Sequence, residues 1–288
     1  MQFYTAMILS LCAGSAVAQN FPVKLVQGIS RPLNTTPAEI FHLKENDESS
    51  SAIKAALISD GIGLLPLSYL GRVASELFLG ASIAKTNFKY KPQDVRALHA
   101  LLNSEWQLPA NRSLAASLSY NMEENRKANS RGYMARADFF LTGLCQGNAL
   151  DIGRSGASLK CYPYGGYYHR KILETDNAML LPRGSHGGGY GGLLIRLSLG
   201  TVGDQGNFWA PVRFEANAYK LRDSRTSGGY EKMSFDFASL TLRYALYQNE
   251  TSRWKPSISL SRAIGTDRLN NLDYVSATRL GFQISYGL

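Results

Sequence analysis

The last eleven residues, Thr278–Leu288, read T-R-L-G-F-Q-I-S-Y-G-L and decide the fold class. Every second residue of this stretch is apolar, at positions Leu280, Phe282, Ile284, Tyr286 and Leu288. Because successive side chains of a strand point to opposite faces, the stretch predicts a β-strand with one wholly apolar face. Such a strand needs hydrogen-bonding neighbours on both edges and surroundings that accept its apolar side chains. A closed antiparallel barrel in a lipid bilayer provides both.

The same alternation recurs in earlier segments, with polar breaks between them. The alternating segments include Val73–Ile83, Leu98–Leu108, Leu114–Tyr120, Tyr133–Leu141, Leu193–Leu199, Phe208–Ala218 and Ile258–Leu260. About ten strands are therefore expected from Val73 onward, and an even number places both ends of the array in the periplasm. In Met233–Tyr247 the apolar positions change from odd to even near Phe237, which predicts a β-bulge.

The breaks between these strands differ in length. Those near Pro109, Gly203 and Thr251 are short and are expected to be periplasmic turns. The longer polar breaks are expected to be outer loops, and they are Asn121–Gly132, Leu173–Tyr190, Arg222–Glu231 and Gly265–Asp273. A connection that contains two cysteines falls on the periplasmic side, where its length is unusual.

The N-terminal part of the chain divides into three regions. Residues 1–18 are expected to be a signal peptide, because a short apolar run ends in the A-x-A site Ala16–Ala18. Residues 19–50 show no periodicity and are expected to be irregular, and residues 51–288 form the barrel domain. Ser50–Leu70 allows two interpretations: two further strands, for twelve in all, or a plug helix inside the pore.

The C-terminal strand resembles that of Gram-negative outer-membrane barrels, which typically end on an aromatic residue. Here the last residue is Leu288, and the aromatic Tyr286 precedes it by two positions. Length, strand number and the C-terminal strand resemble the β-domain of autotransporters, in which the Ser50–Leu70 segment would be the plug helix, but this chain has no passenger domain. The family implied is that of solitary autotransporter-like barrels. This resemblance implies a monomeric all-β, up-and-down barrel of 10–12 strands in the outer membrane, with the barrel-assembly machinery as a partner.

Composition agrees with a barrel and limits the partners. The chain has 27 Gly, 16 Tyr, 12 Phe and 10 Pro, which suits strands, tight turns and aromatic belts. After the signal, no stretch is apolar over the length that a membrane-spanning helix needs. The formal charge of +9 could attract nucleic acid, but secretion argues against that partner. The positive charge is better explained in two ways: attraction to anionic lipopolysaccharide, one of the outer-membrane lipids, and a basic barrel interior.

Two cysteines remain after signal removal, Cys145 and Cys161. In an oxidising compartment their spacing predicts a disulfide, which would stabilise the fold by about 3 kcal/mol. Two free thiols are the alternative. Zinc is not expected, because His169 is the only nearby imidazole. No metal and no cofactor are predicted.

Charged residues on the face opposite the apolar one should line the lumen. They are Glu76, Arg136, Asp138, Arg196, Arg213, Glu215, Arg243 and Arg279. Arg243 belongs to this set only if the bulge is placed correctly, and Arg262 falls on the lipid face, where it could reach lipopolysaccharide. A barrel of this size is filled largely by side chains. The set therefore predicts either an arginine–carboxylate network that plugs the barrel or a narrow conduit that favours anions.

Three functions remain open from the sequence. An integral structural barrel or narrow passive pore fits best. An outer-membrane lipid-modifying hydrolase would need a nucleophile next to a histidine. Ser185 and His186 are adjacent, so in an extended strand their side chains diverge, and we expect His99 and His169 to mark strand faces or loops. The third alternative is a surface adhesion barrel that uses the basic segment Arg222–Lys232.

Overall fold

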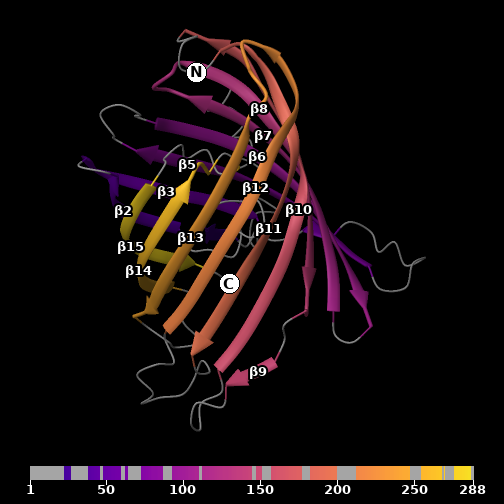
Figure 1. The fold of residues 1–288 in the computed structure, drawn as a ribbon, viewed down its shortest axis with the longest axis vertical. Coiled ribbons are helices and arrows are strands. Elements are labelled where there is room, and N and C mark those ends of the chain that lie inside the picture. The colour runs from indigo at the N-terminus through magenta and orange to yellow at the C-terminus, as the bar shows by residue number, and fades with distance from the viewer. Residues whose placement is uncertain are drawn as a thin grey trace, which may run out of the picture.

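The computed structural model describes residues 23–26, 38–45, 48–59, 62–63, 73–86, 93–109, 112–144, 147–150, 157–176, 182–199, 212–246, 254–267, 269 and 276–286. These residues form one antiparallel sheet that closes on itself (Figure 1). The described part of the chain contains no α-helix and so no helix able to cross a membrane. The predicted signal peptide and Leu288 lie outside the described residues.

Twelve strands make the closed barrel. They are β2 (Ala38–Glu45), β3 (Glu48–Ser59), β5 (Val73–Thr86), β6 (Gln93–Leu108), β7 (Arg112–Asn125), β8 (Ser130–Thr142), β10 (Ala157–Thr175), β11 (Gly184–Leu199), β12 (Val212–Gly228), β13 (Ser234–Ala245), β14 (Trp254–Gly265) and β15 (Ser276–Tyr286). Three short strands complete the sheet, β1 (Val23–Val26), β4 (Ile62–Gly63) and β9 (Gly147–Leu150). Chain neighbours pair in up-and-down order, and β15 pairs with β2, so the last long strand meets the first (Figure 1).

The barrel begins earlier than residue 51. The strand β2 lies within the segment 19–50 that was expected to be irregular, and it pairs with both β15 and β3. The shorter β1 pairs with the far part of β3, at Ala56–Ser59, and touches β15 through Leu25 and Tyr286. Ser51–Ile58 lies within β3, so the strand interpretation of this segment is confirmed. Together β2 and β3 raise the ten strands from Val73 to twelve.

Each strand has an apolar face that points out of the barrel. In β15 the outward Leu280 is 58% exposed, whereas the inward Gln283 is 2% exposed. Leu280 lies opposite Leu260 of β14, which lies opposite Leu242 of β13, so apolar residues form continuous rows across strands. The outward apolar residues include Ile40, Leu57, Leu79, Leu118, Phe139, Tyr167, Leu193, Leu240, Ile258 and Phe282. The alternation that defined the C-terminal segment therefore extends around the barrel.

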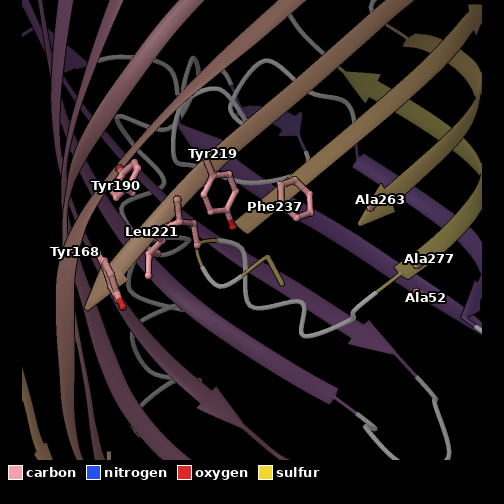
Figure 2. Close-up of a cluster of buried hydrophobic side chains, with 9 residues drawn as sticks. Ala52, Tyr168, Tyr190, Tyr219, Leu221, Phe237, Ala263 and Ala277 are labelled. Atoms are coloured by element: carbon pink, nitrogen blue, oxygen red, sulfur yellow. The ribbon is translucent and has the colours of Figure 1, made fainter. Parts of the chain in front are cut away.

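The interior contains aromatic residues as well as polar ones (Figure 2). Tyr219 of β12 packs on Phe237 of β13, with ring centroids 5.1 Å apart. Leu269, which follows β14, is buried in the same cluster. The other buried members are Ala52, Tyr168, Tyr190, Leu221, Ala263 and Ala277. This part of the interior is therefore filled by side chains rather than left as a wide channel.

The predicted bulge in β13 was wrong. β13 pairs with β12 in unbroken register from Ser234 to Tyr244. The apolar phase changes because Phe237, 5% exposed, packs inside, whereas Leu240, 58% exposed, points outward. Arg243 therefore shares the inward phase without a bulge. Register shifts occur elsewhere, between β11 and β12 at Gly187 and between β8 and β10 near Ile172.

The predicted outer loops are shorter than expected, because the strands continue through charged sequence. Asn121–Gly132 is mostly strand, and β7 and β8 are joined by a turn at residues 126–129 in which Asn129 has φ 42°. Likewise β12 continues to Gly228, through most of Arg222–Glu231. The predicted turn at Pro109 is confirmed between β6 and β7. Backbone ladder hydrogen bonds do not depend on side-chain polarity, so sequence polarity marked the end of the apolar face and not the end of the strand.

Candidate functional site: the charged barrel interior

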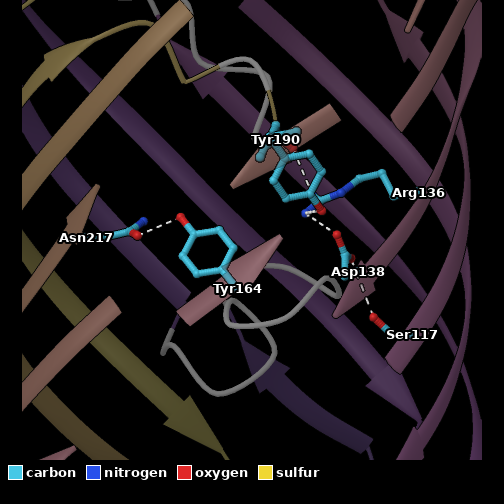
Figure 3. A network of polar contacts seen from close by, with 7 residues as sticks. Ser117, Arg136, Asp138, Tyr164, Tyr190 and Asn217 are labelled. Atoms are coloured by element: carbon cyan, nitrogen blue, oxygen red, sulfur yellow. Dashed lines mark hydrogen bonds and ion pairs between the residues drawn. The ribbon is translucent and has the colours of Figure 1, made fainter. Parts of the chain in front are cut away.

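The interior is organised around a buried ion pair on β8. Arg136 donates to Asp138 at 3.0 Å, and both side chains are almost fully buried. The same guanidinium donates to the Tyr190 hydroxyl at 3.2 Å and lies over the Tyr190 ring. Ser117 of β7 donates to the other oxygen of Asp138 at 3.5 Å (Figure 3). Alternate residues of one strand share a face, which is why positions 136 and 138 meet.

The segment after β14 folds into the barrel and is held there. Arg136 donates to the backbone carbonyl of Leu269 at 3.3 Å. The Tyr219 hydroxyl donates to the Asp267 carboxylate at 2.9 Å. Gly265–Asp273 was predicted to be an outer loop, but Asp267 and Leu269 within it are buried in the interior. These contacts bring Asp267 and Leu269 against inward side chains of β8 and β12.

A second charged group lies on β11, β12 and β13. Arg196 donates to Glu215 at 2.7 Å and lies over the Tyr162 ring. Arg213 donates to Ser198 at 3.3 Å, and it stands directly opposite Arg243 in the register of β12 and β13. Three cations therefore gather around one carboxylate, which leaves this part of the wall basic. We call Arg196, Arg213 and Arg243 the arginine cluster.

The remaining predicted lumen residues lie apart from these groups. Glu76 is exposed and stands opposite Asn103 of β6, and among the described residues no ion pair that includes Glu76 is found. Arg279 of β15 is close enough to Glu39 and Asp267 to interact with them electrostatically. Arg136–Asp138 and Arg196–Glu215 are therefore paired directly, and the predicted set does not form one continuous network.

Several charged interior residues were missed from the sequence, among them the Glu123–Arg170 ion pair, Glu39 and Lys54. Glu39 is buried and accepts hydrogen bonds from Ser259 at 2.6 Å and Gln283 at 3.0 Å. Lys54, its register partner on β3, is also buried. Both lie before Val73, where strand assignment was open. The alternation Ala52, Lys54, Ala56 and Ile58 was the signal that could have placed Lys54 inside.

In the C-terminal halves of β10 and β12 and the N-terminal part of β11, three side chains join in one buried group. The Tyr168 hydroxyl contacts His186 Nδ1 at 3.2 Å and donates to Asp223. Ser185 points the other way and its hydroxyl lies 2.8 Å from that of Ser227. Ser185 and His186 thus diverge, and the buried group ties β10, β11 and β12 together.

The structure describes one of the two cysteines. Cys161 lies in β10 opposite Ile195. Cys145 is outside the described residues, so its disulfide with Cys161 stays a prediction. Within the described ranges, no group of three or more His, Cys, Asp or Glu residues is arranged to hold a metal ion.

Comparison with known proteins found similar solved structures but no matching sequence family. No protein-family model matches the chain, and no curated protein matches it either. Similar solved structures include the translocator domain of the autotransporter NalP from Neisseria meningitidis, with 10% identity and a TM-score of 0.41, covering 100% of this chain and 96% of that one. The β-domain of the Bordetella autotransporter BrkA has 11% identity and a TM-score of 0.42, covering 93% and 99%. The KdgM porin has 8% identity and a TM-score of 0.36, covering 88% and 99%.

Proposed function

We propose that this chain is an integral barrel of a Gram-negative outer membrane, exported by its N-terminal signal peptide and inserted by the barrel-assembly machinery. The observation that carries the proposal is the outward face of the closed barrel. Large apolar side chains such as Leu118, Leu240 and Leu280 are each 58% exposed, while the inward positions of the same strands are buried or partly buried. Only a hydrocarbon surrounding makes this pattern favourable around a whole barrel.

Within that role, the interior fits a narrow and basic passage better than a wide channel. Asp267 and Leu269 are buried inside the barrel, where they bond to Tyr219 and Arg136, and Arg136 is also paired with Asp138. In the arginine cluster Arg213 is exposed, Arg196 and Arg243 are partly buried, and Arg196 pairs with the carboxylate of Glu215. Fixed positive charge in a narrow passage raises the local concentration of anions, so the passage should conduct small anions weakly.

The outer rim supports contact with anionic lipid. Arg262 points outward from β14, in the phase of Leu260 and Ile264, and its guanidinium donates to Thr278 at 2.7 Å. Outward cations near the end of an apolar face can reach the phosphates of lipopolysaccharide while their stems cover apolar surface. This lipid is the proposed partner at the surface of the barrel.

Heat modifiability tests the membrane barrel directly. Outer-membrane fractions that express the full chain are run on a gel with and without boiling. A folded barrel resists detergent, so the unboiled band should migrate differently and should be absent from the soluble fraction. A chain that is soluble without detergent, or mainly helical by circular dichroism, would refute the proposal. Small currents in planar bilayers then separate a narrow pore from a sealed structural barrel.

A further inference from the structure

Three side chains on neighbouring strands form a chain of hydrogen bonds inside the barrel. Ser82 Oγ of β5 lies 2.6 Å from His99 Nε2 of β6. His99 Nδ1 lies 2.7 Å from Asn121 Oδ1 of β7. The sequence separates these residues widely, and the two hairpins of β5, β6 and β7 bring them together.

We propose that Ser82, His99 and Asn121 form a serine hydrolase site that faces the lumen. A hydroxyl nucleophile, an imidazole base and an orienting acceptor, each within hydrogen-bond reach of the next, are the arrangement that activates serine in unrelated folds. The proposal goes beyond the membrane role, because a barrel could fill that role without chemistry.

The hydrogen bonds set the protonation of the histidine. The amide oxygen of Asn121 can only accept, so His99 Nδ1 carries the proton that is donated to it. His99 Nε2 is then unprotonated and accepts the hydrogen bond from Ser82. This is the tautomer in which the ring can take up the serine proton during attack. Asn121 is the positioning residue, and Ser82 and His99 are the catalytic residues.

Burial around the three residues suits these roles. Ser82 and His99 are partly exposed, whereas Asn121 is buried. The register partners of Ser82 are Ala56 and Ala97, both buried with small side chains, so the serine stands among short neighbours on the inward face. The reacting groups are thus open to the lumen, and the orienting group is held rigidly behind them.

The position of the site defines its substrate class. The site lies on the lumen face, near the β5–β6 connection, and not on the face that meets lipid. Its wall is mixed. Glu123 follows Asn121 along the inward face and pairs with Arg170 of β10 at 3.0 Å, whereas Ala56, Leu101 and Phe78 belong to a small apolar cluster beside the site. A water-soluble molecule that carries a short acyl ester fits this environment, whereas a two-chain lipid does not.

The reaction balances without a cofactor. Ser82 Oγ attacks the ester carbonyl carbon as its proton passes to His99 Nε2, and the tetrahedral intermediate collapses with cleavage of the bond to the alcohol oxygen. His99 returns the proton to the departing alcohol, which leaves an acyl-serine. Water then attacks this ester, gives its proton to His99 and releases the carboxylic acid, and Ser82 regains its proton.

The test uses the full folded chain in detergent micelles, with a fluorophosphonate probe and p-nitrophenyl esters. We expect one probe per chain, located on Ser82 by peptide mass spectrometry, and hydrolysis of the acetate ester in preference to long-chain esters. Ser82→Ala should abolish both labelling and hydrolysis, and His99→Gln should reduce hydrolysis by about 10²–10⁴-fold. The matched control is Ser113→Ala. Like Ser82, Ser113 points inward, but it lies on β7 and donates to Glu105 at 2.6 Å instead of contacting a histidine.

Asn121 needs a test that separates positioning from folding. Asn121→Asp keeps an acceptor for His99 Nδ1 and should retain much of the hydrolysis, whereas Asn121→Leu should lose it while keeping the heat-modifiable band. If the folded, heat-modifiable wild type is neither labelled nor active, the proposed site is wrong. It is also wrong if the probe attaches to a residue other than Ser82. Both measurements use the wild type, so they do not depend on whether a variant folds. A preference for long-chain esters would overturn the substrate class. None of these outcomes bears on the membrane barrel, which the unboiled gel band reports separately.

Discussion

At the scale of single residues, the ion pair of Arg136 and Asp138 connects β8 of the barrel wall to Leu269, which follows β14. The pair is buried, and its guanidinium also reaches Tyr190 and the backbone of Leu269. A buried pair gains little over an apolar replacement, because desolvation offsets the attraction, but a single buried charge without its partner is costly.

Replacing Arg136 alone should therefore destabilise the barrel more than replacing the pair. Arg136→Met leaves Asp138 buried without its cation and should lower the free energy of unfolding by about 3–5 kcal/mol. The double variant Arg136→Met with Asp138→Leu should lose clearly less. Urea unfolding of the protein in lipid vesicles measures both. Equal losses in the single and double variants would mean that the charge of Asp138 is not what matters.

Glycines inside the barrel differ from those outside it in how tightly they are packed. A Cβ at Gly166 of β10 would meet the carbonyl of Ala137 and lie 2.7 Å from the Tyr190 hydroxyl. A Cβ at Gly189 of β11 would meet nothing closer than 3.8 Å. Gly166 thus allows the close approach of Tyr190, which Arg136 uses as an acceptor.

Gly166→Ala and Gly189→Ala form a matched pair for this difference. The first should cost on the order of 1–3 kcal/mol through overpacking, because backbone and a buried ring must shift. The second should be nearly neutral, since its methyl group points into open space outside the barrel. The temperature at which the unboiled gel band disappears compares them. A loss of the same size in both variants would show that strand propensity, rather than interior packing, governs these positions.

At the scale of elements, Asp267 and Leu269, which follow β14, act as a strut inside the barrel. Its attachments include the bond from Tyr219 to Asp267, the bond from Arg136 to the Leu269 carbonyl, and the Leu269 side chain in the aromatic cluster. These attachments come from strands on different parts of the wall, so the strut stiffens the barrel as well as narrowing it.

Loosening the strut should widen the passage. Asp267→Ala removes the acceptor of the Tyr219 hydroxyl and should increase the single-channel conductance in planar bilayers. Lys220→Gln is the control, because Lys220 is exposed on the outer face of β12 and its ion pair with Asp236, at 3.4 Å, lies outside the passage. An unchanged conductance in folded Asp267→Ala would show that this segment does not limit ion flow.

At the scale of the whole molecule, charge is distributed unevenly around the inner face of the barrel wall. Carboxylates and arginines pair on β8, whereas the arginine cluster on β11–β13 has one carboxylate, Glu215. The chain carries a formal charge of +9, and this cluster concentrates part of it within the lumen. The field inside a narrow passage is screened less than one at an exposed surface.

The arginine cluster should therefore set ion selectivity. Replacing Arg196, Arg213 and Arg243 together by Gln should shift the reversal potential in a KCl gradient toward cation selectivity. Arg262→Gln removes the same charge from the outer face and should leave the reversal potential unchanged. The control thus separates a local effect of the lumen from a general effect of net charge. A shift of equal size in both variants would argue against the cluster.

The sequence by itself determined the fold class, because alternation with period two fixes which side chains share a face, and the C-terminal segment left only one surrounding that accepts its apolar side. It also identified Arg136, Asp138, Arg196 and Glu215, since parity along a strand is a local property. Tertiary structure alone decided which strands lie side by side, and hence that Ser82, His99 and Asn121 meet and that Leu269 turns inward. Those contacts depend on register between distant segments and on the space left inside the closed barrel, and no local pattern encodes either.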